Sequence, residues 1–392
     1  MRKSVFAFAA LCTAAGAAHA QSSVTLYGAV DSGLTFTSNA KGGHLYNLNS
    51  GTENPNRWGL TGTEDLGGGL AAIFTIEGGF NIGNGTLGQN GTEFGRQAFV
   101  GLTNQYGTVT LGRQVSGSFY AVGSMEAGGD WAAAGTGYGA HPGDADNLDT
   151  SNRIANAVKF KSQTYRGFTF TGTYSFGGKA GDFSQNSIYD LAATYVEGPV
   201  RLAAGYLFVK DPNYSFWGNK ANDSTTASNI TSPVISGYAS AGAEQIVSAG
   251  ASYTVGPAIV GLIYSNTQFQ ELGTVNVAGL NAPARSFTGT ATFNTGEVNL
   301  KYRISPALML GAAYFYTRNS GADNSGTAHY QQVDLGAIYS ISARTSLYAV
   351  AVWQAAAGTD STGGRAVAAI TGATPSSTTH QVVATIGMSH RF

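Results

Sequence analysis

The sequence predicts an all-β fold: a 16-stranded antiparallel transmembrane β-barrel with one unusually long loop. Most of the chain falls into segments of about ten residues in which apolar and polar side chains alternate, the period of strands with two different faces. The composition combines 55 glycines, 20 phenylalanines and 20 tyrosines with only 11% charged residues, whereas soluble domains are about a quarter charged. The sequence has no continuous run of about 18 apolar residues, so we expect any membrane crossing to use strands closed into a barrel.

The first 20 residues resemble a secretory signal peptide. Arg2 and Lys3 form a basic start, residues 5–18 are mostly apolar, and Ala18-His19-Ala20 is a small-residue cleavage site. We therefore expect the mature chain, residues 21–392, to form one outer-membrane barrel domain. Cys12, the single cysteine, leaves with the signal, which excludes a disulfide framework. Loss of the two basic residues lowers the formal charge from −1 to −3, which argues against nucleic-acid binding.

Sixteen segments carry the alternating pattern, an even number as in single-chain outer-membrane barrels. The predicted strands are Val24–Thr37, Arg57–Glu64, Leu70–Ile82, Glu93–Leu102, Gly107–Gln114, Arg153–Gln163, Gly167–Phe176, Ile188–Val196, Val200–Lys210, Gln245–Val255, Ala258–Gln268, Thr295–Ile304, Ala307–Arg318, His329–Ile341, Thr345–Ala355 and Thr379–Phe392. Short turns and longer loops alternate strictly between them. This is the layout of an outer-membrane barrel whose termini and short turns are periplasmic and whose long loops are extracellular.

The third long connection, residues 116–152, interrupts this rhythm. It contains no strand-like alternation, eight glycines and five acidic residues. Loops of this length are uncommon in compact domains and are usually functional or disordered. If the flanking strands close into a barrel, we expect this loop to fold into the lumen and narrow it.

Several motifs spread over the chain carry a family resemblance. They are Ser23-Val-Thr-Leu-Tyr-Gly28, the run from Asn56 to Leu70, Phe94-Gly-Arg-Gln-Ala-Phe-Val-Gly-Leu102, Gly107-Thr-Val-Thr-Leu-Gly-Arg-Gln114 and His390-Arg-Phe392. Together they resemble the general-diffusion porins of Gram-negative outer membranes, particularly the β-proteobacterial branch. The resemblance implies a homotrimer of sixteen-stranded barrels, each with its third loop inside. The terminal Phe392 also resembles the signal that the outer-membrane assembly machinery reads.

The same resemblance implies a charged constriction, with arginines on the barrel wall and carboxylates on the loop. The wall candidates are Arg57, Arg96, Arg153 and Arg113, and the loop acids are Glu126 and Asp130. A lipid-facing arginine costs about 2–4 kcal/mol near the bilayer midplane, so strand arginines should point inward. The competing interpretation is that the arginines form salt bridges that pin the loop and that the acids are merely solvated.

Other chemistry is not supported by the spacing of polar residues. The acidic run 143–149 lacks the full ligand spacing of a calcium loop. The histidines His44, His141, His329, His380 and His390 are scattered, and we interpret them as surface or interfacial side chains rather than zinc ligands. No Gly-x-Ser-x-Gly elbow is present. The sequence therefore predicts no cofactor, no metal and no enzymatic activity.

The function predicted is passive, largely non-specific diffusion of small hydrophilic solutes and ions across the outer membrane. The expected partners are a homotrimer, outer-membrane lipid and lipopolysaccharide, the assembly machinery and small polar solutes. One alternative is a substrate-selective porin for sugars or organic anions, and another is a barrel with a secondary adhesin role. An outer-membrane enzyme such as a phospholipase is disfavoured, because His329 and His390 lack an obvious serine partner.

Overall fold

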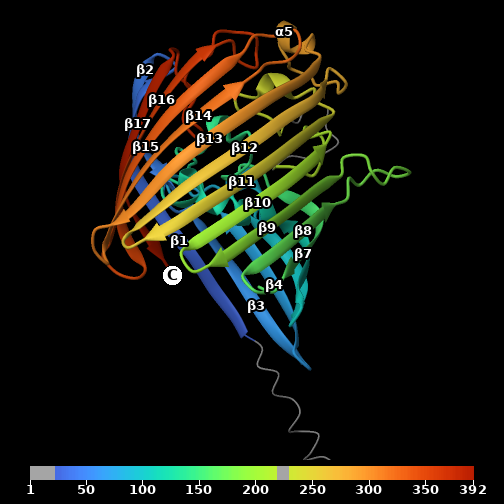
Figure 1. Cartoon of the computed structure of the whole chain (residues 1–392), viewed down its shortest axis with the longest axis vertical. Helices are drawn as coiled ribbons and strands as arrows, with labels where there is room; N and C mark the ends of the chain where they lie inside the picture. Colours follow the sequence, from blue (N-terminus) through green and yellow to red (C-terminus); the bar gives the residue numbers. More distant parts are fainter. Residues whose placement is uncertain (1–22, 219–228) are drawn as a thin grey trace, which may run out of the picture.

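The computed structural model describes residues 23–218 and 229–392, so the predicted signal peptide, residues 1–20, lies outside the described residues. Strands dominate the chain (Figure 1). They are β1 Ser23–Ala40, β2 Gly43–Ser50, β3 Arg57–Gly67, β4 Leu70–Gly79, β5 Gln97–Asn104, β6 Gly107–Gln114, β7 Ile154–Ser162, β8 Phe168–Ser175, β9 Ile188–Glu197, β10 Val200–Lys210, β11 Ala243–Val255, β12 Ala258–Leu272, β13 Gly289–Arg303, β14 Leu308–Asn319, β15 Ala328–Ser340, β16 Thr345–Gly358 and β17 His380–Arg391.

These strands form one closed antiparallel sheet. From β3 to β17 each strand pairs with the next, and β1 pairs with both β3 and β17, which closes a ring of sixteen strands. The predicted sixteen-stranded barrel is therefore confirmed. Turns of two residues join several hairpins, as at Gly68-Gly69 and Gly256-Pro257, where glycine supplies a positive φ.

Strand β2 is a seventeenth strand that the sequence did not predict. The region 38–56 was expected to be a loop, but β1 continues to Ala40 and turns back through Lys41 and Gly42, both with positive φ. Strand β2 then pairs with the C-terminal half of β1, while β3 pairs with its N-terminal half. The segment 51–56 between β2 and β3 is largely buried.

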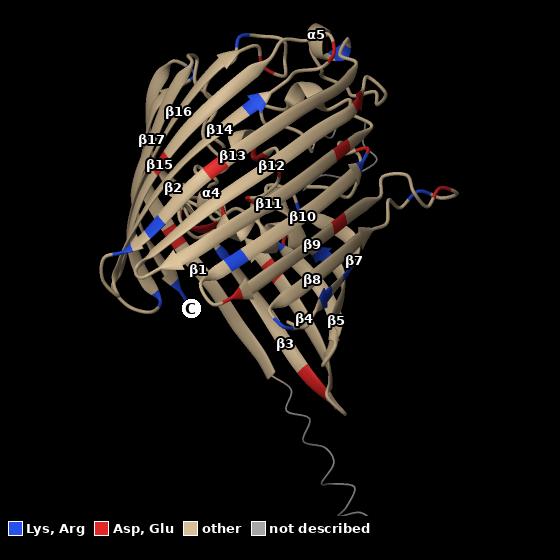
Figure 2. Ribbon diagram, in the orientation of Figure 1, with Lys and Arg blue, Asp and Glu red and all other residues tan. Residues whose placement is uncertain are grey.

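The two faces of the barrel strands differ in polarity. In β13 the buried face presents Thr295, Glu297 and Asn299, whereas Val298 and Leu300 on the other face are exposed. A sheet with polar groups inside and apolar groups outside suits an apolar surrounding. Figure 2 shows how few charged residues lie on the strands that face the viewer.

Helices are short throughout the described chain. They are α2 Gly88–Gly91, α3 Gly117–Ala121, η1 Gly123–Met125, α4 Ala127–Asp130, η2 Pro142–Asp144, η3 Ser236–Tyr238 and α5 Ala282–Arg285. Among residues 23–218 and 229–392, no helix is long and apolar enough to cross a membrane. Four of the seven, from α3 to η2, belong to the connection between β6 and β7.

That connection packs against the buried faces of distant strands. Trp131 is 1% exposed, and its ring covers Gly311 of β14 and Gly336 of β15. A Cβ atom added at Gly311 would lie 2.5 Å from the ring and one at Gly336 would lie 2.7 Å from it. Because a real Cβ cannot approach so closely, these two glycines provide the space in which the tryptophan sits.

The C-terminal residue completes the closure of the ring. The backbone N–H of Phe392 donates to the carbonyl of Gly28, and the N–H of Gly28 donates back, both at 3.1 Å. The Phe392 ring covers Gly28, where any Cβ would collide with it. The first and last motifs of the family resemblance, Ser23–Gly28 and His390–Phe392, thus meet in space.

Candidate functional site

Two of the predicted wall arginines share one carboxylate. Arg57 begins β3 and Arg96 precedes β5, and between them Glu77 of β4 is 4% exposed. Its carboxylate lies 2.7 Å from Arg96 Nε and 3.5 Å from Arg57 Nε, and it accepts a hydrogen bond of 3.0 Å from the Tyr27 hydroxyl. In the sheet, Glu77 pairs with Gly59 of β3 and with Gln97 of β5. Arg57 lies two residues before Gly59 and Arg96 directly precedes Gln97, so this register brings both arginines close to Glu77.

The other two arginines bind backbone carbonyls. Arg113 donates from Nε to the carbonyl of Gly95 at 2.7 Å and from Nη1 to that of Gly218 at 2.9 Å. Arg153, which directly precedes β7, donates from Nη1 to the carbonyl of Thr150 at 3.1 Å. Both guanidinium groups are thereby fixed in direction by strand-end and loop backbone.

Of the two predicted loop acids, Asp130 contacts β13 and Glu126 contacts another residue of the loop. Asp130 forms an ion pair with Lys301 of β13. Glu126 is fully buried and accepts a hydrogen bond of 3.0 Å from the backbone N–H of His141. Neither acid shares a direct contact with the four arginines in the described chain.

Two polar cavities adjoin the loop. One has a volume of about 430 Å³, and Arg96, Arg153 and Asp149 line it. The second, of about 440 Å³, is lined by residues that include Asp144 and Glu244. Both cavities are bordered by Asn90, Ser151, Thr371 and Gly372. Glu126 and Asp130 line neither, so Asp149 is the loop carboxylate that shares a cavity with two of the predicted arginines.

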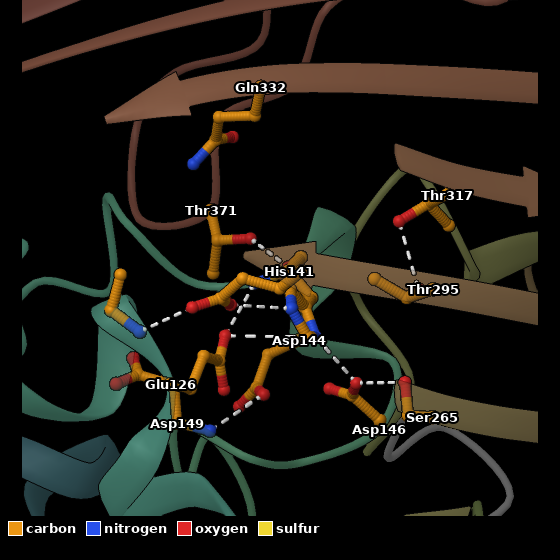
Figure 3. Close-up of polar contacts among 12 residues, drawn as sticks. Glu126, His141, Asp144, Asp146, Asp149, Ser265, Thr295, Thr317, Gln332 and Thr371 are labelled. Carbon is orange, nitrogen blue, oxygen red and sulfur yellow. Dashed lines mark hydrogen bonds and ion pairs between the residues drawn. The ribbon is translucent and has the colours of Figure 1, made fainter. Parts of the chain in front are cut away.

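His141 is the centre of a buried charge cluster, shown in Figure 3. Its Nδ1 lies 2.7 Å from Asp146 Oδ2 and 3.8 Å from Glu126 Oε1, and its Nε2 lies 2.9 Å from Glu297 Oε2. The histidine is only 1% exposed, so the prediction of a surface side chain was wrong for this residue. Sequence spacing could not reveal the cluster, because Glu297 lies 156 residues away on β13.

Burial and the charges of neighbouring groups raise the pKa values of three loop members, for different reasons. Burial raises the pKa of Glu126 well above its usual range, and burial raises that of Asp144 to about 6. For His141 burial acts to lower the pKa, but Glu126 and Asp146 outweigh it and hold the pKa well above 6.5. When the ring is protonated, both of its nitrogens can donate, Nδ1 to Asp146 and Nε2 to Glu297.

Further polar side chains of the barrel hold the loop backbone. Asn299 of β13 donates to the carbonyl of Met125 at 2.9 Å, and Gln332 of β15 donates to that of Tyr138 at 3.0 Å. Thr371, between β16 and β17, donates to the carbonyl of His141 at 3.1 Å. Contacts from these separate elements fix the 116–152 connection, which explains how a loop of this length adopts one conformation.

The family model described as Gram-negative porin matches residues 7–359. The chain belongs to the Gram-negative porin family. Outer membrane porin protein 32 of Delftia acidovorans is 28% identical to this porin over 365 residues, which cover 89% of this chain and 88% of the relative. An outer membrane porin protein of Bordetella pertussis is 35% identical over 233 residues, and the match spans 53% of this chain and 59% of that protein.

Solved structures show the same fold. An anion-selective porin from Comamonas acidovorans superposes with a TM-score of 0.67 and 21% identity, over 95% of this chain and all of that chain. The trimer form of OmpT from Vibrio cholerae gives a TM-score of 0.60 at 16% identity, over 95% of this chain and 99% of the other. The family and the closed barrel together place this porin in the outer membrane.

Proposed function

We propose that this porin is a passive, largely non-specific diffusion channel for small hydrophilic solutes and ions, with residues 116–152 folded into the lumen and narrowing it. The observation that carries the proposal is the pair of adjoining polar cavities, one of which is lined by Arg96, Arg153 and Asp149 together. Opposed charges across a narrow aqueous passage orient dipolar solutes and hinder apolar ones. The channel catalyses no reaction, and the solute gradient drives transport.

The decisive experiment is the conductance of the refolded mature protein in a planar lipid bilayer. Stable open steps, with a conductance that rises with salt concentration, are expected for a water-filled passage. A correctly folded barrel that inserts but conducts no current would contradict the proposal. Folding is checked independently by the heat-dependent migration of the barrel in detergent gels.

A preference for anions is a second candidate property. Arg96 and Arg153 line the cavity, whereas Glu126 is buried against His141 and Asp130 is paired with Lys301. We propose that Asp149 is the carboxylate that moderates this preference. Its replacement, Asp149→Asn, should move the reversal potential in a salt gradient toward anions by several millivolts, and the matched variant Asp130→Asn should move it less. Equal shifts in both variants would contradict this assignment.

Oligomerisation is proposed on the outer face of the barrel. An apolar concavity of about 980 Å³ crosses the outer side of β13–β17 and β1, with Leu34, Leu300, Leu335 and Ile386 along it. The exposed Tyr46 of β2 also borders it. We infer that a homotrimer covers this face and that lipid and lipopolysaccharide surround the rest. The mass of the protein in detergent, measured by light scattering, tests this, and Tyr46→Lys should shift it toward the monomer.

Assembly is proposed to begin at the C-terminus. Phe392 would be recognised by the outer-membrane assembly machinery before its backbone pairs with Gly28. Deletion of Phe392 should lower the amount of folded protein in the outer membrane while leaving the refolded mature chain able to conduct. Loss of conductance as well would indicate that the residue acts on barrel closure instead.

A further inference from the structure

The cluster around His141 carries more negative charge than its hydrogen bonds explain. Glu126, Asp146 and Glu297 surround a single imidazole at 2.7–3.8 Å. If all three carboxylates were ionised, a protonated ring would still leave a net charge of about −2 in a buried site. Uncompensated buried charge is costly, so such a site normally holds extra protons or a bound cation.

Unpartnered oxygens point to a cation. In the described chain, Oε2 of Glu126 and Oδ1 of Asp146 are buried without any hydrogen-bond partner. Their residues are 0% and 3% exposed. Buried polar atoms are almost always satisfied in native proteins, and each exception requires an explanation such as an ion. Of these two residues, Glu126 offers its unpartnered oxygen to an ion, and Asp146 contacts the histidine through its other oxygen.

We propose that Glu126, His141 and Glu297 bind a divalent transition-metal ion of the Zn²⁺ type. One carboxylate oxygen from each glutamate and one ring nitrogen of the histidine lie within 4.8 Å of one another. Bonds of about 2.0–2.2 Å to each donor would bring them around a common centre after small side-chain adjustments. Three protein ligands leave a fourth position for water, as in open zinc sites.

The chemistry of the donors selects the class of metal. An imidazole nitrogen with carboxylate oxygens suits zinc and its first-row neighbours, whereas calcium prefers six to eight oxygen ligands. The ion would take the place of the proton on His141 Nε2, which leaves to solvent, while the Nδ1–H continues to donate to Asp146 at 2.7 Å. A carboxylate that orients the other ring nitrogen is the usual outer partner of a metal-bound histidine.

The barrel already orients the strand ligand. Oε1 of Glu297 accepts hydrogen bonds from the backbone N–H of Ala127 at 2.9 Å and from Asn299 Nδ2 at 2.5 Å. Its other oxygen, Oε2, is therefore directed toward the histidine. Two ligands come from the loop and one from β13, so the ion would fasten the loop to the barrel strand.

Zn²⁺ binding to the whole mature protein, refolded in detergent and freed of metal with a chelator, tests the proposal. Isothermal titration calorimetry should give one saturable Zn²⁺ site per chain, and Zn²⁺ should raise the melting temperature. The variant Glu126→Gln preserves shape but removes one ligand charge, and should weaken binding at least tenfold. The control Glu53→Gln changes another buried carboxylate, whose contact is with the Ala133 N–H, and should leave the affinity unchanged.

Co²⁺ provides a measurement that does not depend on a variant that folds. Bound Co²⁺ should develop visible absorption bands typical of nitrogen and oxygen ligation, and Zn²⁺ should abolish them. Absence of a saturable Zn²⁺ site in the wild-type protein, or equal affinity in wild type and Glu126→Gln, would overturn the proposal. In that case bound protons alone would balance the charge of the cluster, and any weaker Zn²⁺ binding would belong to exposed histidines.

Discussion

Neutralising Glu77 tests whether Arg57 and Arg96 influence the ions that pass through the channel. Its carboxylate contacts Arg96 at 2.7 Å and Arg57 at 3.5 Å. The substitution Glu77→Gln keeps the size and one acceptor oxygen but removes the charge that both guanidinium groups share. The wall should then become more positive, so that anions pass more readily relative to cations.

The structure sets the magnitude of both consequences. Breaking a fully buried ion pair costs about 3–5 kcal/mol, but the side chains of Arg57 and Arg96 are 23% and 14% exposed. Water will recover part of that energy, so we expect a destabilisation of about 1–3 kcal/mol. A unit charge at about 8 Å from a passing ion contributes about 0.5–2 kcal/mol, depending on screening. The anion-to-cation permeability ratio should therefore rise by about 2-fold to 30-fold.

Single-channel recordings in a salt gradient measure the ratio directly, and urea unfolding in detergent measures the stability. Glu64→Gln is the matched control, because Glu64 is an exposed acid near the far end of β3. A reversal potential that is unchanged in Glu77→Gln, or that moves toward cations, would refute the reasoning. Such a result would mean that the Arg57–Glu77–Arg96 group does not face the conducting path.

Three further predictions follow from contacts of the loop and wall. Arg96→Ala or Arg57→Ala should enlarge the single-channel conductance and shift the reversal potential toward cations, and an unchanged conductance would count against a role in the constriction. Gly311→Val should displace the Trp131 ring, because a Cβ at this position would lie 2.5 Å from it. The substitution should lower the free energy of unfolding by about 1–3 kcal/mol. Tryptophan fluorescence reports the displacement, and a wild-type spectrum would contradict it. Burial, and to a smaller extent the charge of Asp31, raises the pKa of Glu53 well above 4.5 in the folded protein. The folded state therefore holds this proton more tightly than the unfolded state, and stability should fall as the pH rises above 4.5 toward the folded-state pKa. Glu53→Gln should flatten that dependence, as judged by melting temperatures across the pH range.

The strands were predictable because each barrel strand has two unlike environments. Water or polar groups on one face and an apolar surrounding on the other impose a period of two on the residue types, as in Val298 and Leu300 against Glu297 and Asn299. Tight turns were equally clear, since glycine and proline mark them. Strand β2 escaped prediction because its residues, including His44 and Asn47, are mostly exposed and carry no consistent alternation.

The contacts of the long loop were not predictable from local sequence. Glu126 was assigned by its resemblance to a loop motif, but its actual neighbours are His141 and, through it, Glu297 on a strand far along the chain. Nothing near Glu297 in sequence distinguishes it from any other polar residue on an inward strand face. Glu77 was missed for the same reason, because only the register of β3, β4 and β5 brings it between two arginines.

The joining of β1 to β17 has a consequence for how the protein is made. Thr35 bonds Thr385 across 350 residues, and Ala29 lies opposite Arg391. The ring therefore cannot close until synthesis is complete, and until then the first and last strands each present an unsatisfied edge. Non-local pairing of this kind slows folding and exposes chains to aggregation. Both edge strands of the nascent polypeptide therefore stay unpaired with each other until its last residues have been made.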